Sequence, residues 1–515
     1  MEERSIPYTD LPGASKLFSD FLSDFDKVRD LYAFSPRKSA SYASAAAALH
    51  YPLERRAALV DALRKQNGES PSLALLARPG TCVVATGQQV GLFTGPAYTI
   101  YKALTAVKLA RRLTEQGIPA VPVFWLATED HDFNEVNHCW VFDSTHRPLR
   151  IEAGGAGHSQ EPVGQIPVSG SPVEDLRRAL EGLPFAGQVL TLAEEAYAPE
   201  RTFGAAFARL LKGLLSSYGL LLLDPLQPEV RKLAAPLLRR AVEDAPELVR
   251  LVLERNQQLE TAGYHAQVHV EPQSTLMFVL EAGRRLPLLR QDGGFSAPAR
   301  SEDLSPSALL RPVVQDYILP TVATVMGPAE VAYMAQAQVL YRALLDRMPV
   351  VVPRAGFTLV DSHAARLLGR YGLSLAGMFA GADALRERIA RKLIPPLLGR
   401  RLEETAAETK ALAEHLCADL VSFDPTLAEA MERSQRKILY QIEKIERKAS
   451  REMLRRDQRA VEETAYLGRM LYPEKHIQER FYSTLPFLAQ HGLGLLDTIY
   501  ENLRLDSPDH QLLLV

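Results

Sequence analysis

Carboxylate and histidine side chains crowd one short segment of the sequence, directly after an apolar run. Residues 128–138 read TEDHDFNEVNH and hold four carboxylates and two histidines, immediately downstream of the apolar residues 121–127. Repulsion among so many like charges costs stability unless a cation, a basic partner or a shared proton compensates. A metal site, a general acid/base pair with carboxylates that orient a ligand, and a solvated acidic turn are three open interpretations, and the second is favoured. The candidate catalytic residues are Asp130, His131 and Asp132, and the candidate binding residues are Glu129 and Asn137.

A glycine-rich segment between a β-branched run and a helical pattern is the second candidate. Residues 86–96 read TGQQVGLFTGP. Their glycines let backbone amides approach a ligand, and the N-terminus of the helix that follows favours anions. The spacing matches neither a Walker A loop nor a GxGxxG fingerprint, and a tight turn that needs glycine for geometry alone is the alternative. The candidate binding residues are Thr86, Gly87, Gln88, Gln89, Gly91, Thr94, Gly95, Tyr98 and Lys102.

Basic, amide and acidic side chains also gather near three further strand or helix ends. Residues 309–317 read LLRPVVQDY, in which Arg311 and Gln315 share a helix face. Residues 327–333 read GPAEVAY, again a glycine turn before a helix, and Arg354 closes a strand where it could hold a carboxylate bidentately. Ordinary ion pairs are the alternative in each case. The candidate binding residues are Arg311, Gln315, Asp316, Gly327, Glu330, Tyr333 and Arg354.

Alternating strand and helix patterns predict the scaffold that positions these segments. A strand at 81–86, a helix at 98–116 and a strand at 121–127 make a βαβ unit, which implies a parallel sheet with a right-handed crossover. Ligands bind outside the carboxyl ends of such strands, so the candidate segments should meet there. We therefore predict an α/β fold with a Rossmann-like, doubly wound core and an insertion near 140–200. The other predicted strands are 220–224, 265–270, 276–280, 321–326 and 349–354.

The pattern becomes purely helical from about residue 361. Two apolar seams separated by the turn at 422–425 predict an antiparallel coiled coil over about 398–460. The predicted seams are Leu402, Ala406, Thr409, Ala413, Leu416 and Leu420, then Leu427, Met431, Ile438, Ile442, Ile445, Ala449 and Met453. The predicted organisation is a helical segment at 1–80, the core at 81–360, the helical region at 361–472 and C-terminal helices at 473–515 that pack back on the core.

Composition excludes several classes of partner. The chain has 515 residues, 47% of them hydrophobic and 23% charged, and its net charge of −3 does not suggest nucleic acid or an anionic membrane as a partner. Its three cysteines form neither a disulfide framework nor a CxxC pair, no apolar run is long enough to span a membrane, and residues 1–10 do not resemble a secretory signal. We expect a cytoplasmic protein without a metal site.

Three stretches make the chain resemble the bacillithiol-biosynthesis cysteine-adding enzyme family. They are ATGQQVGLFTGPAYTIYKALTAVKLA, VPVFWLATEDHDFNEVNH and LLRPVVQDYILPTVATVMGPAEVAYMAQ, and the likeness extends over essentially the whole chain. The resemblance implies a ligase that joins cysteine to the amine of glucosaminyl-malate, giving bacillithiol. It also implies a homodimer and a core similar to class I nucleotidyltransferases and cysteinyl-tRNA synthetase, with a connecting-peptide insertion. A non-catalytic nucleotide- or metabolite-binding scaffold that acts through its coiled coil is the alternative function.

The resemblance suggests roles for the candidate residues. The segment at 86–102 would bind anionic groups, the acidic segment at 130–132 would hold the amine and accept its proton, and Arg311, Gln315 and Arg354 would hold the malyl carboxylates. ATP is implied as an activating co-substrate by fold analogy alone. Class I adenylating enzymes carry a His-x-Gly-His signature at the first βα loop, where this chain has Thr86-Gly87-Gln88-Gln89.

Overall fold

The structure is a computed structural model that describes residues 5–155, 160–289, 298 and 300–515. The described chain divides into two compact units. One runs through Thr358 and resumes at Glu479–Leu513, and the other is the intervening segment Leu359–Gln478. The first unit is therefore discontinuous in sequence.

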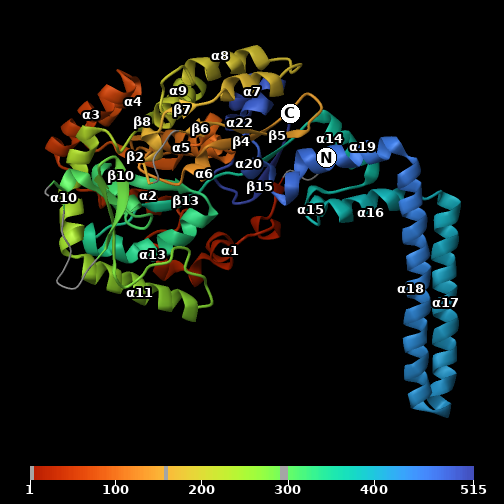
Figure 1. Cartoon of the computed structure of the whole chain (residues 1–515). Helices are drawn as coiled ribbons and strands as arrows, with labels where there is room; N and C mark the ends of the chain where they lie inside the picture. The colour runs from red at the N-terminus through yellow and green to blue at the C-terminus, as the bar shows by residue number, and fades with distance from the viewer. Residues whose placement is uncertain (1–4, 156–159, 290–297, 299) are drawn as a thin grey trace. The chain divides into compact units, whose positions relative to one another are not determined.

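A five-stranded parallel sheet forms the centre of the first unit (Figure 1). Its spatial order is β13-β12-β2-β3-β8, and all four neighbouring pairs are parallel. The chain runs from β2 outward through β3 to β8, and then returns to the other side of β2 for β12 and β13. This reversal creates a switch point beside β2, as in doubly wound folds. The strands are β2 (Cys82–Gln89), β3 (Ala120–Ala127), β8 (Leu221–Leu223), β12 (Thr321–Met326) and β13 (Val350–Pro353).

Both faces of this sheet are covered, because successive side chains along each strand enter different cores. Val83 and Ala85 belong to one hydrophobic cluster, whereas Cys82 and Val84 belong to the other. The predicted Rossmann-like α/β class is confirmed. The first cluster also takes residues from α3 (Leu53–Asn67), α10 (Pro228–Glu243), α11 (Ala245–Thr261), α12 (Arg311–Ile318) and α13 (Pro328–Leu344), and the second from α2 (Ser39–Ala47) and α5 (Tyr98–Glu115).

A small antiparallel sheet, β10-β9-β11, accompanies the main one. The strand predicted at 265–270 is absent, and that prediction was wrong. There, the amide side chain of Gln336 pairs with both the N–H and the carbonyl of Val268, so a side chain replaces a neighbouring strand. The small sheet comprises β9 (Ser274–Glu281), β10 (Arg284–Leu289) and β11 (Leu304–Pro306).

The segment between β3 and α9 (Phe203–Leu215) is where the insertion was predicted. Two short strand pairs, β4-β5 and β6-β7, are followed by two helices. These elements are α6 (Phe133–Val136), β4 (His138–Phe142), β5 (Pro148–Glu152), β6 (Gly154–Gly155), β7 (Val168–Ser169), α7 (Pro172–Ala179) and α8 (Ala186–Ala196). The same unit also contains α1 (Lys16–Ser23), α4 (Pro71–Leu76), α21 (Leu485–His491) and α22 (Leu495–Asn502).

Helices make up the second unit, whose longest pair is an antiparallel hairpin (Figure 1). Asp424 caps the second helix, because its carboxylate accepts the backbone N–H of Thr426. The predicted C-terminal coiled coil is confirmed. Within the described ranges no helix combines the length and the apolar character that a membrane crossing requires. The helices are α14 (Ser362–Tyr371), α15 (Leu375–Met378), α16 (Ala382–Lys392), α17 (Pro396–Phe423), α18 (Pro425–Arg456) and α19 (Gln458–Leu471).

The seam between α17 and α18 differs in detail from the predicted one. Leu416, Ile438 and Ile445 are 47%, 46% and 56% exposed, so they lie outside the seam. Ala413 and Ala428 are buried in it, and the Cys417 thiol contacts the carbonyl of Ala428. Ala413 was predicted in the seam and is buried there. At Leu416, Leu427 and Ile438 the prediction is wrong by one residue, because the following residue, Cys417, Ala428 or Leu439, is the less exposed one.

Candidate functional site

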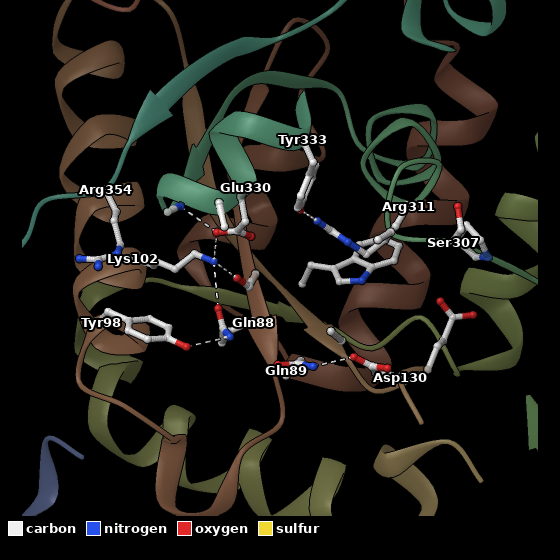
Figure 2. A pocket seen from close by; sticks show the side chains of 18 of the residues that line it. Gln88, Gln89, Tyr98, Lys102, Asp130, Ser307, Arg311, Glu330, Tyr333 and Arg354 are labelled. Carbon is white, nitrogen blue, oxygen red and sulfur yellow. Dashed lines mark hydrogen bonds and ion pairs between the residues drawn. The ribbon is translucent and has the colours of Figure 1, made fainter. Parts of the chain in front are cut away.

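A cavity of about 360 Å³ lies at the carboxyl ends of the central strands (Figure 2). Its wall includes the last residues of β2 and the residues that follow β3, β12 and β13. This is the position at which a doubly wound sheet binds ligands. The predicted residues that line it are Gly87, Gln88, Gln89, Tyr98, Lys102, Glu129, Asp130, Arg311, Gly327, Glu330, Tyr333 and Arg354.

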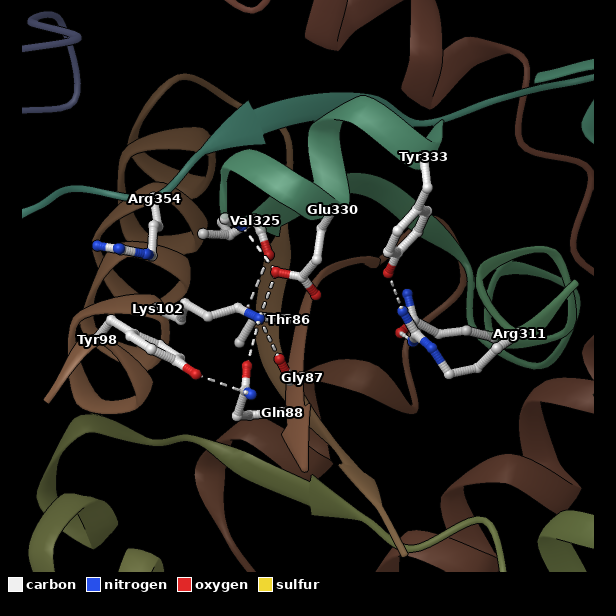
Figure 3. Close-up of polar contacts among 12 residues, drawn as sticks. Thr86, Gly87, Gln88, Tyr98, Lys102, Arg311, Val325, Glu330, Tyr333 and Arg354 are labelled. Atoms are coloured by element: carbon white, nitrogen blue, oxygen red, sulfur yellow. Dashed lines mark hydrogen bonds and ion pairs between the residues drawn. The ribbon is translucent and has the colours of Figure 1, made fainter. Parts of the chain in front are cut away.

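The Lys102 side chain is locked into the wall of this cavity (Figure 3). Its ammonium lies 2.6 Å from Glu330 Oε2 and 3.1 Å from Gln88 Oε1, and it also donates to the carbonyl of Gly87. These contacts use all three ammonium hydrogens, and burial lowers the pKa of Lys102. Glu330 in turn accepts the backbone N–H of Gly327 at 2.7 Å, which caps α13. Lys102 thus joins β2, α5 and α13 and is not a free cation for an anionic ligand.

One carboxylate of the acidic loop faces the cavity and has no close basic partner among the described residues. Glu129 is neutralised by Arg231, whose guanidinium lies 2.9 Å away, and both side chains are largely buried. Asp130 instead accepts a hydrogen bond of 2.7 Å from the Gln89 amide, and the nearest guanidinium, that of Arg285, is 4.0 Å away. Asp130 is therefore the carboxylate of this loop that can act on a ligand in the cavity.

His131 has a fixed tautomer that limits its role. Arg285 Nη1 lies 3.1 Å from His131 Nδ1, and a guanidinium can only donate, so Nδ1 accepts and the ring proton is on Nε2. Burial and the Arg285 charge both lower the pKa of His131. Neither His131 nor the exposed Asp132 lines the cavity. In the described part of the chain, no three His, Cys, Asp or Glu side chains converge as metal ligands would.

Several residues of the glycine-rich segment, for which an anion site was predicted, have structural roles. A Cβ on Gly87 would lie 2.7 Å from the carbonyl oxygen of Trp125, its partner residue on β3, so glycine is required for strand packing. Gly95 has a φ of +64° in the turn before α5, and the Ala97 N–H at the start of that helix donates to the Tyr482 carbonyl at 2.8 Å. Because the Lys102 ammonium is also paired with Glu330, these residues do not fit a phosphate cradle for ATP.

Other predicted residues serve the scaffold. The Thr86 hydroxyl donates to the Val325 carbonyl and joins β2 to β12. Asp316 is fully buried and accepts hydrogen bonds from Gln315 and Tyr341, away from the cavity. The predicted residues that do not line the cavity are Thr86, Gly91, Thr94, Gly95, His131, Asp132, Asn137, Gln315 and Asp316.

Four polar residues of the cavity wall are not among the site residues predicted from the sequence. Arg285 comes from β10, and Arg480 lies more than a hundred residues beyond β13, the last strand of the sheet, so no local pattern linked either to the sheet. Trp125 was included in an apolar strand, and Ser307 follows β11. The wall thus holds five basic and three acidic side chains, a formal excess of two positive charges that favours anionic ligands.

The fold and the cavity together define a general class of protein. The chain is a Rossmann-like protein with a cationic cavity at the switch point of its parallel sheet and with a helical hairpin. Two family models match the chain, "Bacillithiol biosynthesis BshC, N-terminal Rossmann-like domain" over residues 1–301 and 296–355, and "Bacillithiol biosynthesis BshC, C-terminal coiled-coil domain" over residues 357–515. The chain belongs to the BshC family.

Similar proteins cover almost the full length of the chain. A protein of Solibacter usitatus named "Putative cysteine ligase BshC" is 51% identical over 99% of both chains. Proteins with the same name from Koribacter versatilis and Salinibacter ruber are 36% and 32% identical, over 99% and 96% of this chain and 99% and 95% of their own lengths.

Proposed function

We propose that the protein is the cysteine ligase of bacillithiol biosynthesis and joins the carboxyl group of L-cysteine to the amine of glucosaminyl-malate. Relatives that match almost the whole chain carry the ligase name. One structural observation supports the chemistry most directly. A half-buried carboxylate without a close basic partner, Asp130, faces a cavity whose wall is otherwise rich in cations. Such a cavity suits a substrate that carries both an amine and carboxylates.

Asp130 is the group that acts on the amine in this proposal. Its carboxylate attracts the substrate ammonium and accepts a proton from it, which frees the nitrogen lone pair. The amine then attacks the carbonyl carbon of an activated cysteinyl carboxyl group, and the C–N bond forms as the C–O bond to the leaving group breaks and that group departs with the electron pair. Gln89 holds Asp130 in place from β2. His131 is excluded as the acceptor through Nδ1, because protonation there would break its bond to Arg285 and place two cations together. Residues 86–102 do not form a phosphate cradle for ATP, so ATP is given no role in this step.

The test is metabolic and chemical. A deletion strain should lose bacillithiol and accumulate glucosaminyl-malate, and the wild-type sequence should restore the thiol. A strain complemented with Asp130→Asn should resemble the deletion strain at matched protein level. A deletion strain with normal bacillithiol would exclude the ligase function and favour the scaffold alternative.

We also propose that the protein acts in the cytoplasm as a homodimer that uses the hairpin of α17 and α18. The free state of Cys82, Cys139 and Cys417 supports a reducing compartment. Apolar side chains exposed on the hairpin support association, since soluble helices rarely leave such residues uncovered. They include Leu412, Leu416, Phe423, Leu427, Ile438 and Ile445.

A further inference from the structure

Two buried polar atoms in the cavity wall have no hydrogen-bond partner among the described residues. They are the indole Nε1 of Trp125 and the hydroxyl of Ser307. The Trp125 side chain is only 1% exposed, so water does not solvate it freely. An unsatisfied buried donor costs about 1–3 kcal/mol, and an acceptor supplied by a ligand in the cavity would offset this cost.

The same cavity wall holds a guanidinium, that of Arg311, that has no carboxylate partner in the described part of the chain. Arg311 donates to the Tyr333 hydroxyl at 2.8 Å and to Gln315 Oε1 at 3.3 Å, and both partners are neutral (Figure 3). Its backbone N–H donates to the Ser307 carbonyl at 2.8 Å, so the first turn before α12 fixes these two residues together. Figure 2 shows their side chains at one end of the cavity, the end where Asp130 also lies.

The other basic residues of the wall are already committed, with one exception. Lys102 is paired with Glu330, and Arg354 with the buried Glu479. Arg285 donates to Ser305, to the Pro306 carbonyl and to His131. The exception, Arg480, is exposed and contributes no buried donor.

We propose that Trp125, Ser307 and Arg311 form a carboxylate subsite of the cavity, called here the donor corner. The indole and the guanidinium can only donate, and the hydroxyl can donate as well, so these three side chains offer hydrogens to an anionic oxygen. The inference rests on the proposed function, which supplies two carboxylate-bearing ligands, L-cysteine and glucosaminyl-malate. Asp130 beside the corner would then hold the amine of the same ligand or of the second one.

The two tryptophans of the chain make a direct test possible. Trp140→Phe leaves Trp125 as the single tryptophan, whose emission reports on the corner. Each ligand is compared with an analogue that lacks the carboxylate: L-cysteine with cysteamine, and glucosaminyl-malate with methyl glucosaminide. The carboxylate ligand that occupies the corner should change the emission saturably, and its analogue should not. The responding pair identifies which of the two carboxylate sources binds there.

Three variants then measure the contribution of each donor by calorimetry. Ser307→Ala, Trp125→Phe and Arg311→Lys should each weaken binding of the responding ligand about tenfold to a hundredfold, while affinity for its analogue stays within twofold. Ser301→Ala, a serine outside the cavity wall, is the matched control and should bind as the wild type does. Ser307→Ala and Trp125→Phe keep the proposal testable if Arg311→Lys fails to fold.

Failure of the donor corner and failure of the proposed function would give different results. If the wild type makes bacillithiol but all three variants bind both carboxylate ligands with unchanged affinity, the donor corner is overturned and the ligase function stands. Equal losses for a ligand and its analogue would also overturn the corner, because they would indicate a general defect. If the wild type neither binds the ligands nor makes bacillithiol, this result contradicts both the proposed function and the donor corner.

Discussion

At the scale of single residues, Asp130 and His131 are neighbours in sequence with different capacities. Asp130 lines the cavity and accepts a hydrogen bond from the Gln89 amide. The His131 ring accepts a hydrogen bond from Arg285 and does not line the cavity. Position within one loop therefore says little about role. What separates the two residues is whether a proton can be accepted without breaking an existing contact.

Replacement of Asp130 by asparagine should remove the proton acceptor while keeping the shape of the side chain. We expect kcat to fall about 10²–10⁴-fold, the usual contribution of a general base. Product formation by mass spectrometry and thermal unfolding, measured on the same preparation, would check this. Asp132→Asn, a change of the same kind at an exposed position outside the wall, is the control. A variant of Asp130 with activity within threefold of the wild type would rule out the role.

His131 should remain neutral through the physiological range. Burial and Arg285 hold its pKa below the ordinary value of 6.5, so the folded protein binds a proton here less readily than the unfolded chain does. Stability from this group is complete above about pH 6.5 and is lost as the pH falls through the folded pKa. NMR titration of the imidazole would give the value directly. His131→Gln should leave the acid limb of the pH–activity profile in place, and a pKa above 6.5 would contradict the assignment.

At the scale of elements, the ion pair of Lys102 and Glu330 joins a strand and two helices at the cavity. Lys102→Met should leave the Glu330 carboxylate without its partner in a largely buried site, and we expect a loss of about 3 kcal/mol in the free energy of unfolding. The double variant Lys102→Met with Glu330→Gln should recover most of that loss, because no charge then remains unpaired. Urea denaturation of both proteins would measure it. Equal losses in the two variants would mean that the lysine contributes packing alone.

The sequence patterns predicted the elements better than the contacts among them. β2, α5 and β3 follow from apolar periodicity, and the cavity follows from the rule that ligands bind at the carboxyl ends of parallel strands. The role of Gly87 could not be predicted, because it depends on the distance to Trp125 across the sheet. Arg285 and Arg480 could not be predicted either, since tertiary folding alone brings them to the wall. The seam of α17 and α18 was predicted correctly at Ala413 but was shifted by one residue at Leu416, Leu427 and Ile438, because the sequence does not show which of two adjacent apolar residues faces the other helix.

At the scale of the whole molecule, the hairpin offers a test of association. Ile438 is 46% exposed on α18, so Ile438→Asp should leave the seam intact while placing a charge on the proposed contact face. We expect unchanged helicity by circular dichroism and a monomer by light scattering. Arg436→Asp, about 200° around the same helix, is the control and should remain dimeric. A dimer that survives Ile438→Asp would move the interface elsewhere.

The discontinuity of the first unit has a consequence for the order in which the protein is made. Glu479 pairs with Arg354, Tyr482 receives the first amide of α5, and Arg480 enters the cavity wall, yet all three leave the ribosome after the entire helical unit. During synthesis of Leu359–Gln478 the five strands of the central sheet are already made, but the cavity wall still lacks Arg480 and the Arg354 guanidinium still lacks its Glu479 partner. Closure across such long sequence separations is slow. The cavity wall is thus completed only at the end of translation, and a chain that stops before Glu479 lacks both Arg480 and the carboxylate partner of Arg354.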